Sequence, residues 1–354
     1  MALTDKLTAI GDAVRAKTGG TDLIALDMMP AEIEGISTGF PNGTEWYQSN
    51  ITSGYIYCFH NANGIWVAGS NYGLYYSTDG MTWTQSNITS GTFYKVYNAN
   101  GIWVAGTSSN GLYYSTDGMT WTQSDITSRT FESIYYANGI WVAPTNSWHG
   151  LFYSTDGMTW TQVYTIGSYP SVYYADGIWV LGGGYETKGL HYSTDGMTWT
   201  QSNITDIYIY DIYNANGMWV AGTNSNGFYY STDGMTWTQS NITSGTFYKV
   251  YKGNGIWVAG SNHGLYYSTD GMTWTQSNIT SGNWQNVYYA NGVWISGVRT
   301  GTPKLGFYYS TDGMTWTQSN ITDIYTYDIY NANGMWVAST NDNGIFYSPT
   351  WLPS

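Results

Sequence analysis

Short segments of alternating apolar and polar residues, separated by turn residues, follow one another along almost the whole chain. In the unit at residues 93–124, residues 93–98 alternate, and Ala99-Asn100-Gly101 then makes a turn. Residues 102–106, 112–115 and 120–124 are further short segments, the last two joined through Asp117-Gly118. Asn-Gly and Asp-Gly supply the positive φ angles that tight hairpins need. The pattern therefore predicts four short antiparallel strands in each unit.

Two sequence markers repeat with the same period. The string Ser-Thr-Asp-Gly-Met-Thr-Trp, called the box below, occurs seven times, with its aspartate at Asp79, Asp117, Asp156, Asp195, Asp233, Asp270 and Asp312. A Gly-(Ile/Met/Val)-Trp marker occurs eight times, with its tryptophan at Trp66, Trp103, Trp141, Trp179, Trp219, Trp257, Trp294 and Trp336. Four strands in roughly 40 residues are typical of a propeller blade. The sequence predicts an all-β, eight-bladed β-propeller of four-stranded blades.

The two ends of the repeat array complement each other. The eighth unit ends at 347–351 without a box, whereas residues 44–52, before the first unit, resemble residues 82–89 at the end of it. We expect this N-terminal strand to complete the last blade and close the ring, which removes an exposed sheet edge. The predicted propeller covers residues 43–354.

Residues 1–38 differ from the repeats. Leu3, Leu7, Ile10 and Val14 would form one apolar stripe on a helix that Gly19-Gly20 ends, and Pro30 could begin a second short helix. Two short helices bury little surface alone. We therefore predict a helical attachment or oligomerisation module, which leaves a homo-oligomer possible.

Composition limits the partners. The net charge of −13 and pI near 4.3 disfavour nucleic acid and anionic membranes. Cys58 is the single cysteine, which excludes an intramolecular disulfide and a multi-cysteine metal site. We expect no cofactor, no signal peptide and no membrane span.

Two resemblances add expectations. The box resembles the Asp-box, Ser-x-Asp-x-Gly-x-Thr-Trp, of sialidase-type (BNR) propellers, although it is one residue shorter between Asp and Gly. The resemblance implies a structural turn, since an Asp side chain can bond turn amides while the Trp packs between blades. Residues 3–10 and 28–33 look like the leader of tail or tail-fibre proteins in phages and prophages of Gram-positive gut bacteria. This resemblance implies a virion-attached protein that reaches the cell exterior at lysis, without a signal peptide.

Catalytic and metal chemistry find little support. The box offers one carboxylate per turn, whereas Ca²⁺ takes six to eight oxygen ligands. Sialidase chemistry needs an arginine cluster and a Tyr–Glu pair, but the propeller has only Arg129 and Arg299. His60 stands where other units carry tyrosine and is interpreted as a core residue. The Asn-Ile-Thr triplets match glycosylation sequons, and we interpret them as a repeated loop conformation; they lie at Asn87, Asn203, Asn241, Asn278 and Asn320. We therefore predict that the protein is not an enzyme and binds no metal.

Differences between units are concentrated in the loops after the second strand and in the connections between blades. In a four-stranded blade both emerge on one face, where propellers usually bind ligands. Tyr72, Trp148, His149 and Tyr185 lie in these loops, and Trp148 and Trp284 are the two tryptophans outside the repeat markers. Because exposed aromatic rings stack on sugars, we expect these five residues to contact a ligand.

One position of the innermost strand, six residues before each marker glycine, does not repeat. It holds Cys58, Lys95, Ser133, Ser171, Asp211, Lys249, Asn286 and Asp328. A central channel that binds polar ligands through Lys95, Lys249, Asp211 and Asp328 would have this composition, and so would a water-filled hole.

The favoured function is a non-catalytic binding module, a phage or prophage tail-associated receptor-binding protein that recognises cell-surface carbohydrate. Residues 1–38 would hold it to virion or tail components. The alternative is a structural or protein-interaction propeller with recently amplified repeats and no specific small ligand. A third possibility is a glycosidase of unusual type.

Overall fold

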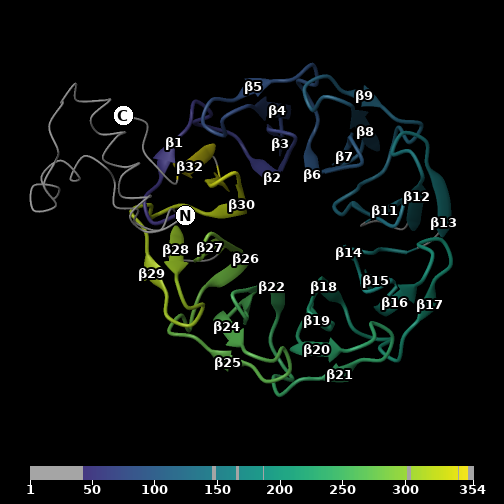
Figure 1. Ribbon diagram of the computed structural model, residues 1–354, viewed down its shortest axis with the longest axis vertical. Helices are drawn as coiled ribbons and strands as arrows, with labels where there is room; N and C mark the ends of the chain where they lie inside the picture. The colour runs from purple at the N-terminus through teal and green to yellow at the C-terminus, as the bar shows by residue number, and fades with distance from the viewer. Residues whose placement is uncertain are drawn as a thin grey trace, which may run out of the picture. The chain divides into compact units, whose positions relative to one another are not determined.

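The computed structural model describes residues 43–145, 149–164, 167–185, 187–300, 304–341 and 343–349. These residues form eight four-stranded antiparallel sheets around a central axis (Figure 1). The predicted all-β, eight-bladed propeller is therefore confirmed. The helices predicted within residues 1–38 lie outside the described residues.

Each blade has four strands, which are named here by their position from the central axis outward: innermost, second, third and outermost. The innermost strands are β2 (Ile56–Ala62), β6 (Phe93–Ala99), β10 (Tyr135–Ala137), β14 (Ser171–Ala175), β18 (Ile209–Ala215), β22 (Phe247–Gly253), β26 (Asn283–Ala290) and β30 (Thr326–Ala332). The second strands are β3 (Ile65–Ser70), β7 (Ile102–Thr107), β11 (Ile140–Pro144), β15 (Ile178–Gly183), β19 (Met218–Thr223), β23 (Ile256–Ser261), β27 (Val293–Thr300) and β31 (Met335–Thr340). The third strands are β4 (Gly73–Ser77), β8 (Leu112–Ser115), β12 (Leu151–Ser154), β16 (Gly189–Ser193), β20 (Phe228–Ser231), β24 (Gly264–Ser268), β28 (Phe307–Ser310) and β32 (Ile345–Pro349). The outermost strands are β5 (Thr84–Gln85), β9 (Thr122–Gln123), β13 (Thr161–Tyr164), β17 (Thr200–Gln201), β21 (Thr238–Gln239), β25 (Thr275–Gln276), β29 (Thr317–Gln318) and β1 (Tyr47–Gln48).

Seven blades are built from consecutive strands, and the eighth combines the two ends of the described chain. Its strand order is β1-β32-β31-β30, with Tyr47 opposite Tyr347 and Gln48 opposite Phe346. The hairpins between innermost and second strands follow the expected turn chemistry. Asn100 and Gly101, for example, have φ angles of 50° and 78°. Two successive positive φ angles suit a two-residue hairpin turn, as the Asn-Gly pair predicts.

The hydrophobic core lies between blades. In the cluster between the first two blades, Val67 and Leu74 of one blade pack with Phe93, Trp103 and Trp121 of the next. Similar clusters occur at the other blade interfaces. Second strands are buried on both faces, which explains their continuous apolar sequence, Ile-Trp-Val-Ala-Gly in β7. The repeated residues therefore serve mainly to hold neighbouring blades together.

A closed aromatic ring joins the innermost strands of all eight blades. Its members are His60, Tyr97, Tyr135, Tyr173, Tyr213, Tyr251, Tyr288 and Tyr330, with neighbouring ring centroids 4.9 to 5.7 Å apart. Each member also meets the marker tryptophan of the next blade edge-on, as His60 meets Trp103. His60 is thus half-buried among aromatic neighbours, at the position that the other seven blades fill with tyrosine. Burial, with a further contribution from nearby Lys95, lowers the pKa of His60 to about 3.

The box aspartates hold turns, as the sequence predicts. In the fourth blade, Asp195 Oδ1 accepts hydrogen bonds from the backbone N–H groups of Met197 and Thr198 at 2.8 and 2.7 Å. Ser193 Oγ donates to the same oxygen at 2.9 Å and accepts from Gly196 N–H. These bonds favour the charged carboxylate, and the Thr198 amide contributes most to lowering the pKa of Asp195.

We expect Asp195→Ala to destabilise the propeller by about 1 kcal/mol at neutral pH, because two turn amides lose their acceptor. The folded-state pKa of Asp195 lies below its unfolded value, so its contribution is present above the unfolded pKa. The difference between variant and parent should therefore shrink as the pH falls below about 4. Urea unfolding at pH 7 and pH 3 measures this. A difference that grows with acidity would contradict the assignment.

The asparagine of each Asn-Ile-Thr triplet reaches to the next blade. Asn87 Nδ2 donates to the carbonyl of Trp121 at 2.9 Å, and Asn87 Oδ1 accepts from the N–H of Trp121 at 2.8 Å. This two-bond clasp recurs in the pairs Asn50–Trp83, Asn203–Trp237, Asn241–Trp274, Asn278–Trp316 and Asn320–Trp46. The triplet is therefore a repeated inter-blade contact, which agrees with the loop interpretation.

Candidate functional site

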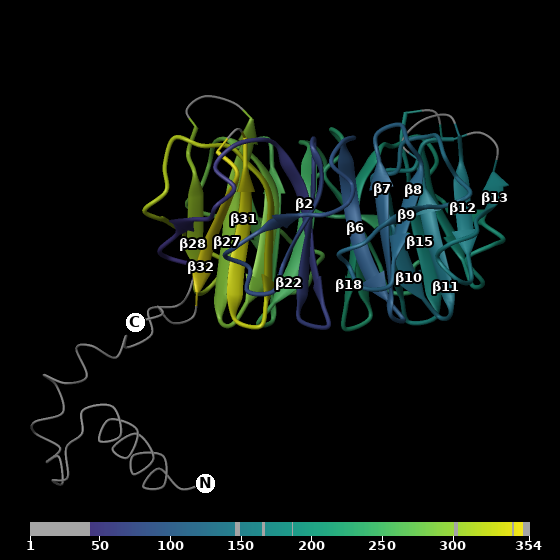
Figure 2. The same ribbon diagram turned by 90° about the horizontal axis from the view of Figure 1, so that it is seen from above.

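The loops that vary between units gather at one end of the propeller. The connection between two blades bonds to the second-to-third loop of a blade it joins, as when Asn71 N–H donates to Tyr55 O and Ser108 N–H to Thr92 O. We call this end, seen edge-on in Figure 2, the variable face. The box turns join third to fourth strands and lie at the opposite end.

Two of the expected ligand contacts are exposed aromatic residues on the variable face. Tyr185 and Tyr72 expose 66% and 56% of their surface. The ring of Tyr185 lies 4.7 Å from that of Tyr208 in an edge-on contact. His149 is partly exposed, and its backbone carbonyl accepts a hydrogen bond from Gln162 Nε2. Trp148 lies outside the described residues.

The expectation that Trp284 contacts a ligand from an exposed loop is wrong. Trp284 is fully buried, and its Nε1 donates to Ser281 O at 2.7 Å. It occupies the position eight residues before the marker glycine, where the other blades carry buried Ile56, Phe93, Phe131, Tyr169, Ile209, Phe247 and Thr326. Trp284 is therefore a core residue, larger than the residues at the equivalent position of the other blades.

The charged residues predicted to line the axis bond to neighbouring strands. Lys249 Nζ lies 3.2 Å from Asp211 Oδ1, while Asp211 Oδ2 accepts from the N–H of Val250 in the next blade. Burial alone would lower the pKa of Lys249, but the Asp211 carboxylate, with a further contribution from Asp328, raises that pKa. Asp211 and Lys249 thus also make contacts between blades, and ligand binding in the channel stays a prediction.

Asp328, like Asp211, accepts a backbone N–H bond from the next blade, here at the junction of the last and first blades. Its Oδ2 accepts from the N–H of Phe59 at 2.9 Å, and its Oδ1 from that of Ile329 at 3.0 Å. Burial raises the pKa of Asp328, and Lys95 two blades away opposes that rise. Lys95 is partly exposed on β6.

A set of tyrosines that was not predicted from the sequence lies at the inner rim of the variable face. They stand seven residues before the marker glycine: Tyr57, Tyr94, Tyr210, Tyr248 and Tyr327, with Glu132, Pro170 and Gln285 in the other three blades. In β2, Ile56 pairs with Ser70 and Cys58 with Gly69, so Tyr57 is the extra residue of a β-bulge. A bulge redirects a side chain that strict alternation would place differently. The enrichment of tyrosine at this position was the available signal.

Side chains at this rim form a continuous arc over seven blades. From Tyr185 the ring contacts run through Tyr208 and Tyr210 to Tyr248, with centroids 4.6 to 5.0 Å apart. Hydrogen bonds continue from Tyr248 through Asn283 and Gln285 to Arg299. Arg299 stacks over Tyr327, which contacts Tyr57, and Tyr57 contacts Tyr94. We call this series the rim arc.

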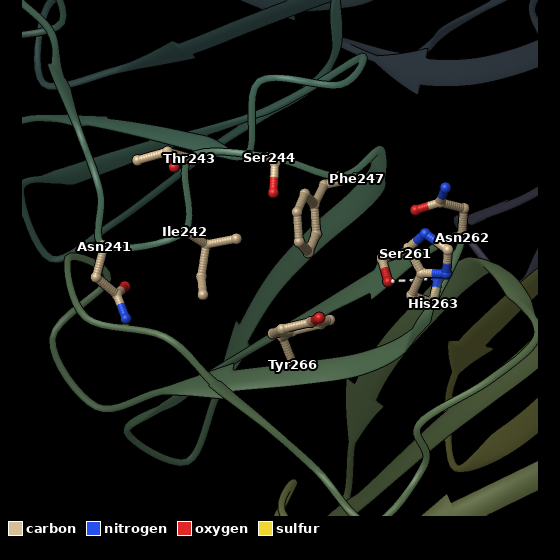
Figure 3. A pocket seen from close by; sticks show the side chains of 10 residues that line it. Asn241, Ile242, Thr243, Ser244, Phe247, Ser261, Asn262, His263 and Tyr266 are labelled. Carbon is tan, nitrogen blue, oxygen red and sulfur yellow. Dashed lines mark hydrogen bonds between the residues drawn. The ribbon is translucent and has the colours of Figure 1, made fainter.

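Two pockets open beside the connections between blades. The larger, about 500 Å³, is lined by the connection at 241–245 and by Phe247, Ser261, Asn262, His263 and Tyr266. Figure 3 shows the side chains of Ile242, Phe247 and Tyr266 around its interior, with Ser261 accepting a bond from the His263 N–H at 3.0 Å. The smaller, about 370 Å³, includes Tyr185, Lys188 and His191.

Within the described ranges, no group of three or more His, Cys, Asp or Glu residues is placed to hold a metal ion. In the same part of the chain, no helix is long and apolar enough to cross a membrane. Asp211 and Asp328 both accept backbone N–H bonds, so each carboxylate is already a structural acceptor.

No protein-family model matches the chain, and no curated protein matches it. Solved structures do match. The computationally designed Ika8 protein aligns over 87% of this chain and 100% of its own, with 10% identity and a TM-score of 0.68. YCF48 bound to a D1 peptide aligns over 90% of this chain and 96% of its own, with 14% identity and a TM-score of 0.55.

The GH74 enzyme of Niastella koreensis also matches, with 19% identity and a TM-score of 0.53. The alignment covers 82% of this chain and 48% of the enzyme, so the chain spans about half of that protein. At these identities the likeness shows the propeller fold alone. A propeller fold fits a binding or interaction module.

Proposed function

We propose that this protein is a non-catalytic binding module that recognises carbohydrate on a cell surface through the variable face. The observation that carries the proposal is the run of tyrosines from exposed Tyr185 through Tyr208 and Tyr210 to Tyr248. Tyrosine offers a planar apolar ring and a polar hydroxyl at low conformational cost. Such a surface suits the C–H faces and hydroxyl groups of a sugar.

The setting of the protein belongs to the same proposal. Residues 1–38 would attach it to virion or tail components, and lysis would bring it to the cell exterior. Genes for tail assembly next to its own would support this, and a metabolic gene neighbourhood would contradict it.

A protein-interaction module is the second candidate, because a propeller of similar fold, YCF48, has been solved bound to a D1 peptide. Tyrosine-lined grooves also accept extended peptides. Screening a glycan array and a peptide array in parallel separates the two candidates. Hydrolysis of fluorogenic glycosides by the purified protein would instead favour the glycosidase alternative.

We expect Tyr185→Ala to weaken glycan binding at least fivefold, since aromatic anchors dominate binding surfaces and truncating one typically costs more than about 1 kcal/mol. Titration of an array-selected glycan by calorimetry measures the change. Met197→Ala is the matched control, because Met197 is 38% exposed in the same blade but lies at the box-turn end. Equal loss in both variants, or no loss in Tyr185→Ala, would count against the variable face as the binding surface.

A further inference from the structure

Arg299 stands at the centre of the rim arc because the seventh blade has a longer inner hairpin than its neighbours. β27 has eight residues, whereas β23 and β31 have six. Asn283 pairs with Thr300 and Trp284 with Val298, which leaves Arg299 as the extra residue of a bulge. Gln285 is the extra residue of the adjoining bulge on β26. The two bulged side chains meet, and Arg299 Nη1 donates to Gln285 Oε1 at 3.1 Å.

The guanidinium of Arg299 is held in place but not neutralised. Its Cζ lies 4.8 Å from the ring centroid of Tyr327, so one face of the guanidinium is stacked. The side chain is nevertheless exposed. The ion pair recorded among the described residues joins Lys249 to Asp211, so within those ranges Arg299 has no carboxylate partner. An arginine that is oriented and lacks an anion is ready to receive one.

A group of tyrosine rings in mutual contact extends from Arg299 and Tyr327. Tyr57 contacts Tyr327 at 5.4 Å and Tyr94 at 5.1 Å, both edge-on, and Tyr55 contacts both Tyr57 and Tyr327. Burial raises the pKa of Tyr57, and the nearby Arg299 charge opposes that rise, which places the hydroxyl within the field of the guanidinium. The Tyr57 hydroxyl therefore stays neutral and can donate a hydrogen bond at physiological pH.

We propose that Arg299, Tyr57, Tyr94 and Tyr327 form a subsite for a carboxylate-bearing sugar, a hexuronic acid residue. The planar guanidinium matches a carboxylate with two parallel N–H donors, while the tyrosine rings meet the sugar ring. A neutral sugar would leave the arginine without an anionic partner. A protein of net charge −13 repels acidic polysaccharides in general, so this local positive charge provides the selectivity. The inference rests on the carbohydrate-binding function proposed above and names its ligand class.

The test compares uronic acid oligosaccharides with their carboxyl-reduced, neutral counterparts and with phosphorylated sugars, all titrated against the full chain. We expect the uronic acid oligosaccharides to bind best. Arg299→Gln should weaken their binding at least tenfold and leave the neutral sugars unchanged. Arg299→Lys should recover only part of the lost affinity, because lysine keeps the positive charge but lacks the two parallel N–H donors of the guanidinium. Lys304→Gln is the matched control, since it removes the same charge from an exposed residue stacked over Tyr325, outside the rim arc.

The outcomes separate this inference from the proposed function. If neutral sugars bind as well as acidic ones, and Arg299→Gln changes neither, the inference is wrong while carbohydrate binding stands. Stronger binding of phosphorylated sugars would also overturn it, in favour of a phosphate ligand. If no sugar of any class binds, the proposed function itself fails. If Arg299→Gln and Lys304→Gln weaken uronic acid binding equally, the effect comes from net charge alone. That result would contradict a specific subsite at Arg299.

Discussion

The variant Trp46→Ala is expected to lose about 3–5 kcal/mol of stability, the typical cost of truncating a fully packed tryptophan. Trp46 is 2% exposed and packs in the cluster between the seventh and eighth blades. Its backbone is held by the Asn320 clasp, and its Nε1 donates to Gly43 O. The two-residue strand β1 depends on these contacts, because β1 is not joined to β32 by a box turn. Urea unfolding measures the loss.

A second readout tests the predicted closing role of β1. Ser49 N–H donates to Ile345 O and β1 pairs with β32, so freeing β1 should speed amide hydrogen exchange in β32. Trp121→Ala, at the equivalent position inside the array, should destabilise the protein without this local effect. Glu45→Ala, at an exposed neighbour of Trp46, should change neither stability nor exchange. Unchanged exchange in Trp46→Ala would mean that β1 does not hold the last blade.

The largest pH effect is expected at His60. In the unfolded chain His60 takes up a proton below its ordinary pKa of 6.5, whereas burial in the aromatic ring lowers the folded-state pKa to about 3. A folded-state pKa below the unfolded one means that stability is present above pH 6.5 and is lost as the pH falls. We expect the parent to lose about 1.4 kcal/mol more than His60→Tyr for each pH unit between about 5.5 and 4.

His60→Tyr completes a ring whose other seven members are tyrosines, so the substitution should fit. At pH 7 the variant is expected to be at least as stable as the parent, because edge-on aromatic pairs contribute about 0.5–1.5 kcal/mol. His263→Tyr, on an exposed loop, is the control for the loss of a histidine. Urea unfolding at several pH values gives the slopes. Parallel slopes for parent and His60→Tyr would show that His60 is not buried in its neutral form.

The fold could be predicted because nearly every repeated residue has a local reason for its type. Asn100-Gly101 needs positive φ angles, Asp195 bonds its own turn, and Trp103 fills the space between two blades. These requirements act within one unit or between neighbours, so the periodic sequence displays them directly. The helices predicted for residues 1–38 remain a prediction.

The site was harder to predict because its residues depend on departures from regular pairing. Trp284 differs from its counterparts in size, yet it lies in the same buried position. Tyr57 and Arg299 reach the rim through bulges, which alternation does not reveal. Asp211 and Lys249 looked available in the sequence because hydrogen bonds between blades cannot be seen in one unit.

The Asn320–Trp46 clasp has a consequence for how the array can evolve. Residues at this junction make the same two hydrogen bonds as the Asn–Trp pairs at five other junctions, such as Asn87 and Trp121. A recombination event between near-identical repeats that removes or inserts one whole unit would leave both partners of the junction present. Blade number can then change in a single genetic step with both bonding partners of the junction retained. A ring with another blade number closes only if these contacts also hold at a different angle between neighbouring blades.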